Sequence, residues 1–223
     1  MIVVLLPGLL LGGGAALLVK LRFRKYSKIP SRSGLSGGEM AVEILRRNGL
    51  SGVGVEPREG FLSDHYDPTS RTVRLSPDVY NGRSVAAVAV AAHEVGHAIQ
   101  HAKAYGPMAL RHAAVPLASI GSNLSFFLLI GGYFMNVYNL MLAGVILFGV
   151  VVFFQLVTVP VEFNASSRAK AQLLTLVPAS EADGVSKVLS AAALTYVAAL
   201  VVALLELVHW LIRLGLIGGS RDE

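Results

Sequence analysis

The sequence contains no cysteine among its 223 residues, and only 15% of them are charged. The absence of cysteine excludes a disulfide scaffold, a cysteine-ligated zinc site and thiol catalysis. An average soluble domain is about 25% charged and about 45–50% apolar, whereas 54% of this chain is hydrophobic and its mean hydropathy is +0.62. The composition therefore excludes a disordered chain and almost any soluble globule. It indicates a helical membrane protein with one small polar domain.

Acidic residues are absent from the stretch 20–32, which holds six of the 19 Lys and Arg residues. The other 13 face 14 Asp and Glu, so the net charge of +5 comes from this basic collar. Basic residues flank membrane helices on the cytoplasmic side and attract anionic lipid headgroups. We expect the collar to face the cytoplasm. No basic face with interleaved aromatic residues is present, which argues against nucleic-acid binding.

Long stretches without charge predict four membrane spans. The first lies within residues 1–19. No Asp, Glu, Lys, Arg or His occurs from 113 to 161, a stretch long enough for two spans joined near 131–139. The fourth span is expected over 188–212, followed by a tail over 213–223. The charge bias of the loops then places both chain ends outside and the polar segments in the cytoplasm.

The polar segments are predicted to be 20–112 and 162–187. Ser36 and Glu39 have the spacing of a capping box, which predicts a helix over 37–48. A long helix is expected over 84–103. Between these helices, the glycine-rich stretch 51–55 predicts a turn and residues 61–76 predict two short extended pieces.

The sequence His-Glu-Val-Gly-His occupies residues 93–97 of the long predicted helix. Residues four apart share a helix face, so His93 and His97 can bind one metal ion. Glu94 is placed to take a proton from a water molecule on that metal. Zinc suits such a site because it accepts N and O ligands and keeps a fourth position open in catalytic centres. The small apolar neighbours of the motif indicate burial, where unpaired histidines would be costly. One Zn2+ per chain is predicted.

A third protein ligand is needed, and Glu162 is the best candidate because it is the first charge after the stretch 113–161. Carboxylates near membrane depth are rare and are usually functional. His101 continues the four-residue series, but it lies about 12 Å from His93 along a straight helix. His101 and His65 therefore stay alternatives, either as the third ligand or as the fourth ligand of a closed structural site.

Six stretches of the sequence are characteristic when taken together: SDHYDP (63–68), VRLSPDVYNGRS (73–84), AAHEVGHAIQHA (91–102), IGSNLS (120–125), QLVTVPVEFNAS (155–166) and AAALTYVAA (191–199). They resemble the bacterial membrane zinc metallopeptidases of the YugP family, also called neutral zinc metallopeptidase type 2. This resemblance implies a gluzincin-like site with zinc on His93, His97 and Glu162 and with Glu94 as the base. One departure is Asn164, where an acidic residue is usual in the family, so a carboxylate at that position cannot support a ligand here.

Further polar residues are candidates for substrate binding or ligand support. His65 and Tyr66 precede the metal helix on a predicted strand, where they could steady an oxyanion. Arg168 could orient a carboxylate or be one more cytoplasmic positive charge, and Tyr196 could face the site or be an interface tyrosine. Glu206 and His209 in the fourth span are expected to form a hydrogen-bonded pair away from the site.

The predicted fold is mainly α: a multi-pass bundle of about four spans with a small α+β gluzincin-like cytoplasmic domain. The predicted function is a zinc-dependent endopeptidase of the bacterial cell membrane that cuts membrane-associated proteins or peptides near the cytoplasmic surface. The alternatives are a catalytically idle zinc-bearing scaffold or adaptor and a hydrolase of a lipid amide. Besides the bilayer and a substrate, a second copy or another membrane protein could pack on the small residues of the spans.

Overall fold

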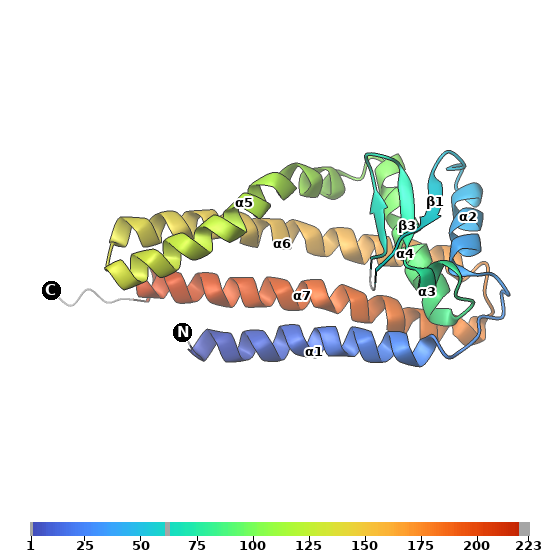
Figure 1. The fold of residues 1–223 in the computed structure, drawn as a ribbon, viewed down its shortest axis with the longest axis horizontal. Helices are drawn as coiled ribbons and strands as arrows, with labels where there is room; N and C mark the ends of the chain where they lie inside the picture. Colours follow the sequence, from blue (N-terminus) through green and yellow to red (C-terminus); the bar gives the residue numbers. More distant parts are fainter. Residues whose placement is uncertain (1, 61–62, 219–223) are drawn as a thin grey trace.

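The computed structural model describes residues 2–60 and 63–218, and it confirms the predicted fold class. Four long helices lie side by side, and a small domain with a three-stranded sheet caps one end of them (Figure 1). Helix α6 packs between α5 and α7, and α1 packs on α7. All four are long and apolar enough to cross a membrane: α1 (Ile2–Tyr26), α5 (Gly106–Met135), α6 (Tyr138–Leu173) and α7 (Ala182–Arg213).

Helix α6 extends beyond the predicted span, because residues 162–173, the first part of the predicted segment 162–187, continue the helix. Its 36 residues span about 54 Å, well beyond a hydrocarbon core of about 30 Å. The extension is stabilised by a row of buried side chains four residues apart, namely Val161, Ala165, Ala169 and Leu173. Since such a row forms one ridge of a helix, the extension packs against the small domain.

The sheet of the small domain contains β1 (Gly54–Pro57), β2 (His65–Asp67) and β3 (Thr72–Leu75) in the order β1-β3-β2. Strand β2 runs antiparallel to β3 around the predicted turn, whereas β1 pairs with β3 in parallel. The prediction of a turn over 51–55 was wrong at its end, because Gly54 and Val55 belong to β1. A parallel partner far along the chain leaves no local pattern in so short a strand.

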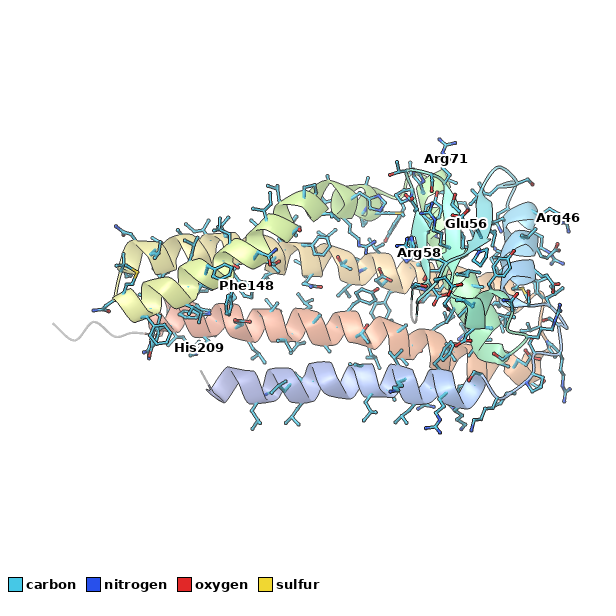
Figure 2. All side chains as sticks on the ribbon, in the orientation of Figure 1. Arg46, Glu56, Arg58, Arg71, Phe148 and His209 are labelled. Atoms are coloured by element: carbon cyan, nitrogen blue, oxygen red, sulfur yellow. The ribbon has the colours of Figure 1, made fainter. Side chains whose placement is uncertain are left out.

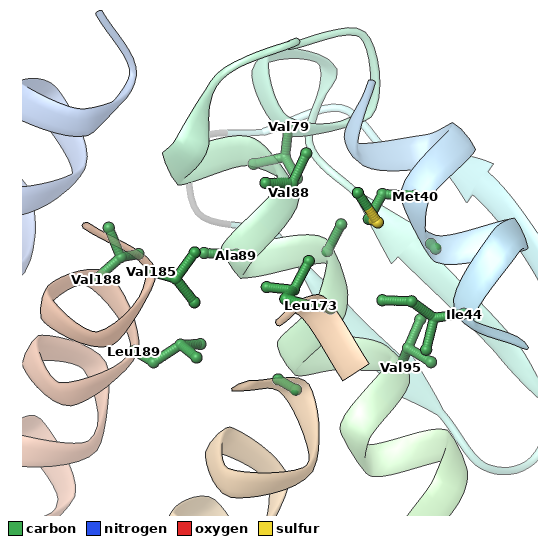
Figure 3. Close-up of a cluster of buried hydrophobic side chains, with 14 of the residues drawn as sticks. Met40, Ile44, Val79, Val88, Ala89, Val95, Leu173, Val185, Val188 and Leu189 are labelled. Carbon is green, nitrogen blue, oxygen red and sulfur yellow. The ribbon is translucent and has the colours of Figure 1, made fainter. Parts of the chain in front are cut away.

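The hydrophobic core of the small domain includes the ends of the long apolar helices. Helix α2 (Gly37–Arg47) has the predicted capping box and lies over the sheet with α3 (Pro77–Tyr80). Figure 3 shows side chains of these helices meeting others from α6 and α7 around the central helix α4 (Val85–Ala102). The contributors include Met40, Ile44, Val79, Val88, Val95, Leu173, Val185 and Leu189. The domain is thus packed directly onto the bundle.

Helices α4 and α6 cross in close contact at Gly96. A methyl group at this position would lie 2.5 Å from the carbonyl oxygen of Ala165, nearer than two such atoms can approach. Only glycine therefore permits this separation of the two helices. Helix α4 begins and ends within one residue of the expected range 84–103, and the side chain of Ser84 caps it by accepting from the Ala87 amide.

The exchange Gly96→Ala is expected to lower the free energy of unfolding by about 1–3 kcal/mol, because the added methyl group forces the helices apart. Gly149→Ala is the matched control, since nothing lies within 4 Å of a methyl group there. Thermal unfolding in detergent, followed by circular dichroism, measures both variants. Equal unfolding midpoints for Gly96→Ala and the native chain would contradict the described crossing.

Candidate metal centre

Helices α4 and α6 bring His93, His97 and Glu162 together in the interior. Nε2 of His93 lies 3.2 Å from Glu162 Oε2, and Nε2 of His97 lies 3.5 Å from the same oxygen. One donor atom from each residue falls within 4.8 Å of the others, and the Glu162 side chain is only 1% exposed. Glu94 is buried on α4 beside His93. The sequence predicted this group of three from spacing and from the position of one carboxylate.

Each of the two imidazole rings has a hydrogen-bond partner at Nδ1, the ring nitrogen that does not face Glu162. Nδ1 of His93 is 3.2 Å from the Ser166 hydroxyl, and Nδ1 of His97 is 3.0 Å from Gln100 Oε1. With these nitrogens engaged, each ring turns Nε2 toward the carboxylate. Ligating histidines in metal sites are usually oriented by such outer hydrogen bonds.

Gln100 fixes the proton of His97 through a chain of hydrogen bonds. Its amide nitrogen donates to the Val161 carbonyl oxygen at 2.8 Å and to Asn164 Oδ1 at 3.0 Å. Asn164 Oδ1 also accepts from Arg168 Nε at 2.7 Å. Because a carbonyl only accepts and a guanidinium only donates, Gln100 must present its oxygen to His97. In the neutral imidazole, Nδ1 of His97 then carries the proton and the lone pair of Nε2 points into the cluster.

Asn164 and Arg168 therefore affect the clustered residues only indirectly, through Gln100 and His97. Arg168 contacts Asn164 rather than the carboxylate of Glu162, so the structure gives it a supporting position behind His97. The sequence did not indicate Gln100 or Ser166. Both could have been found as residues one helical turn away from a predicted ligand, since Gln100 follows His97 by three positions and Ser166 follows Glu162 by four.

The charges around His97 favour its protonated form. Burial alone would lower the pKa of this imidazole, but the hydrogen bond to Glu162 and the charges of Glu94 and Glu162 outweigh burial and raise the pKa. A metal ion needs the neutral imidazole. Protons and metal therefore compete for the cluster, and metal affinity decreases as the pH decreases through this raised pKa.

The donor set fits zinc. Two imidazole nitrogens and one carboxylate oxygen are the three protein ligands of many catalytic zinc sites, in which a fourth position stays open. Among residues 2–60 and 63–218, no further His, Asp or Glu belongs to the group. The Nδ1 atom of His101 is instead 2.8 Å from the Tyr66 hydroxyl. His65 contacts the Ser63 carbonyl oxygen and Arg58. A closed site with a fourth protein ligand therefore has no support in the described part of the chain.

His65 and Tyr66 lie on β2, where neighbouring side chains point to opposite faces. Tyr66 faces α4 and contacts His101, one turn beyond His97. His65 faces the loop that follows β1. His65 and Tyr66 therefore make no hydrogen bond to the three clustered residues. Tyr66 comes closer to them, because its partner His101 lies one turn after His97 on α4.

Two residues from the flanking helices complete the surroundings of the cluster. Tyr196 of α7 is half-buried and close enough to Glu162 and Glu94 for their charges to act on it. Arg111 of α5 brings Nη2 to 3.7 Å from Glu162 Oε1, the oxygen turned away from the histidines. Tyr196 was among the predicted candidates. Arg111 was not, because no spacing relates it to the motif.

A second feature lies at the far end of the bundle. Glu206 and His209 line a largely apolar cavity of about 650 Å³ between α1, α5, α6 and α7. Figure 2 shows Phe148 and His209 at the end of the bundle opposite to Glu56 and Arg58 of the small domain. Among the hydrogen bonds of the described residues, none joins Glu206 to His209, so the prediction of a hydrogen-bonded pair was wrong.

Comparisons with known proteins show the family of the chain. A sequence model of the family described as "Putative neutral zinc metallopeptidase" matches residues 1–215. A curated relative from Bacillus subtilis (strain 168), named "Putative membrane protease YugP", is 51% identical over 207 residues, which cover 92% of this chain and 91% of the relative. No solved structure gave a significant match. The matched region includes His93, His97 and Glu162.

Replacing Gln100 with Met is expected to weaken zinc binding by about 10–100-fold, because the acceptor that orients His97 is lost. Gln172→Met is the matched control. It removes a side-chain hydrogen bond between Gln172 and Asn48 and leaves the cluster untouched. Competition with a fluorescent chelator measures the zinc dissociation constant of both variants. The same value for Gln100→Met and the native chain would refute the orienting role.

Proposed function

Since the chain belongs to the neutral zinc metallopeptidase family, we propose that it is a zinc-dependent endopeptidase of the cell membrane. It cuts membrane-associated proteins or peptides near the cytoplasmic surface. The observation that carries this proposal is the buried group of His93, His97 and Glu162 with Glu94 beside it. Each chain binds one ion.

The residues of the cluster have separate roles in this proposal. His93, His97 and Glu162 hold the ion through two nitrogens and one oxygen. Zinc supplies a positive charge that lowers the pKa of water and polarises a carbonyl group. Glu94 accepts the proton of the attacking water and returns it to the amine nitrogen when the peptide bond breaks.

The position of strand β2 favours a peptide as the substrate. It is an edge strand, because it pairs with β3 on one side in the order β1-β3-β2. It packs against α4, and its Tyr66 reaches the turn of α4 that follows His97. An extended peptide can add to such an edge through main-chain hydrogen bonds. A substrate bound there would run past the metal ligands.

The two alternatives have less support. A zinc scaffold would use a closed site, whereas the candidate fourth ligands His65 and His101 have other partners. A lipid-amide hydrolase would need an apolar cleft at the cluster. The apolar cavity that contains Glu206 lies instead at the opposite end of the bundle, on the evidence of Figure 2 and its lining residues.

The exchange Glu94→Gln should reduce cleavage of casein and of a fluorogenic peptide mixture by at least about 10²-fold, since the amide cannot take a proton. Zinc content should stay the same, because Glu94 is not a proposed ligand. Glu59→Gln, at an exposed carboxylate, is the control. Turnover at the native rate in Glu94→Gln would overturn the proposed function.

The cytoplasmic orientation is proposed from the distribution of charge. The basic collar begins in the last turns of α1 and continues to residue 32, at the end of the bundle that carries the small domain (Figure 1). Arg168 and Lys187 lie at the same end, near the end of α6 and the start of α7. Positive residues beside membrane helices mark the cytoplasmic side. The group of His93, His97 and Glu162 would then face the cytoplasm.

The lack of cysteine permits a direct test of orientation. Ser51→Cys places one thiol on the exposed surface of the small domain, and Val137→Cys places one between α5 and α6 at the other end. A membrane-impermeant maleimide should label Val137→Cys in cells with a permeabilised outer barrier. It should label Ser51→Cys only in inverted membrane vesicles. The reverse pattern would place the site outside.

A further inference from the structure

The guanidinium of Arg111 lies beside Glu162, and none of its nitrogens has a hydrogen-bond acceptor among the described residues. Its Nη2 atom is 3.7 Å from Glu162 Oε1, which is an ion-pair distance but too long for a hydrogen bond. Its Nε atom is buried and has no partner among the described residues. A buried N–H without an acceptor is costly and uncommon in proteins. The arrangement therefore favours an acceptor that arrives from outside the chain.

The balance of charge points to an anionic acceptor. With a divalent ion in place, the carboxylates of Glu94 and Glu162 neutralise it, and Arg111 adds one positive charge. The Arg111 side chain is 25% exposed, whereas that of Glu162 is 1% exposed. Arg111 is therefore the more accessible partner of the pair. It comes from α5, which provides none of the three clustered residues.

We propose that Arg111 is a catalytic residue that donates hydrogen bonds to the carbonyl oxygen of the peptide bond being cut. This inference rests on the proposed function. As the water oxygen bonds to the carbonyl carbon, the carbonyl electron pair moves onto its oxygen and the water proton moves to Glu94. When the pair returns, the C–N bond breaks and the nitrogen takes the proton from Glu94. Arg111 stabilises the negative oxygen between these two steps.

Three other candidates are less well suited to this task. The Tyr66 hydroxyl is committed to His101, and His65 faces the loop after β1. Tyr196 approaches the same charges from α7, but a phenol brings no positive charge. Preorganised donors at a developing oxyanion are among the largest contributions to catalysis. A guanidinium with free N–H groups in a partly buried site fits this role.

Activity measurements with Arg111→Met and Arg111→Lys test the proposal. Arg111→Met should keep its zinc and lose about 10²–10³-fold in kcat on casein, with little change in KM. Arg111→Lys should recover part of this loss, because it retains a cation. Arg46→Met, at an exposed arginine of α2 that pairs only with Glu43, is the control. Native kcat in Arg111→Met, together with an inactive Glu94→Gln, would overturn the role of Arg111 and leave the proposed function intact.

A binding measurement tests Arg111 independently of turnover. Inorganic phosphate, a tetrahedral anion, is titrated into the zinc-loaded full chain by calorimetry. Arg111→Met should bind phosphate at least about tenfold more weakly than the native chain, and equal affinity would overturn the proposal. If no substrate is cut by the native chain, the proposed function fails and the catalytic role of Arg111 fails with it, while the phosphate titration still shows whether Arg111 binds an anion.

Peptide pairs with free and amidated C-termini identify the oxygen that Arg111 recognises. Equal loss of kcat on both members of a pair supports contact with the carbonyl oxygen. A loss confined to peptides with a free carboxylate would contradict it, since Arg111 would then bind the terminal carboxylate.

Discussion

The contact of Gly96 with the Ala165 carbonyl determines how close α4 and α6 lie. The candidate metal ligands come from both helices, so their separation depends on this contact. His93 and His97 are three residues before and one residue after Gly96. Glu162 is one turn before Ala165 on the other helix. The ligands thus lie on the faces that meet at the crossing. Their geometry is set by the packing of two rigid helices rather than by loops, as a preorganised site requires.

The long apolar helices also contribute to the core of the small domain. Leu173 of α6 and Val185 and Leu189 of α7 are part of its core, so the domain cannot move freely against the bundle. The cluster lies where the two meet, with Arg111 and Tyr196 reaching it from the membrane helices α5 and α7. This placement suits a substrate that is itself held at the membrane surface. The hydrogen-bond chain behind His97 joins α4 to α6 through Gln100, Asn164 and Arg168.

Local sequence patterns predicted part of this arrangement. Helical periodicity located α4 within one residue and paired His93 with His97, and the rarity of charge after residue 113 singled out Glu162. Strand β1 was not predictable, because its partner β3 is distant in the chain and only tertiary pairing makes it a strand. The same limit applies to Arg111, which approaches the cluster from another helix with no sequence spacing to the motif.

Metal content of the purified chain, compared between the native protein and Glu162→Gln, tests the central claim most directly. We expect about one zinc per native chain, as for a single three-ligand site. Zinc binding should be lost or sharply weakened in the variant, because the amide supplies no negative oxygen to the ion. Unchanged zinc affinity in Glu162→Gln would contradict a centre built where α4 and α6 cross.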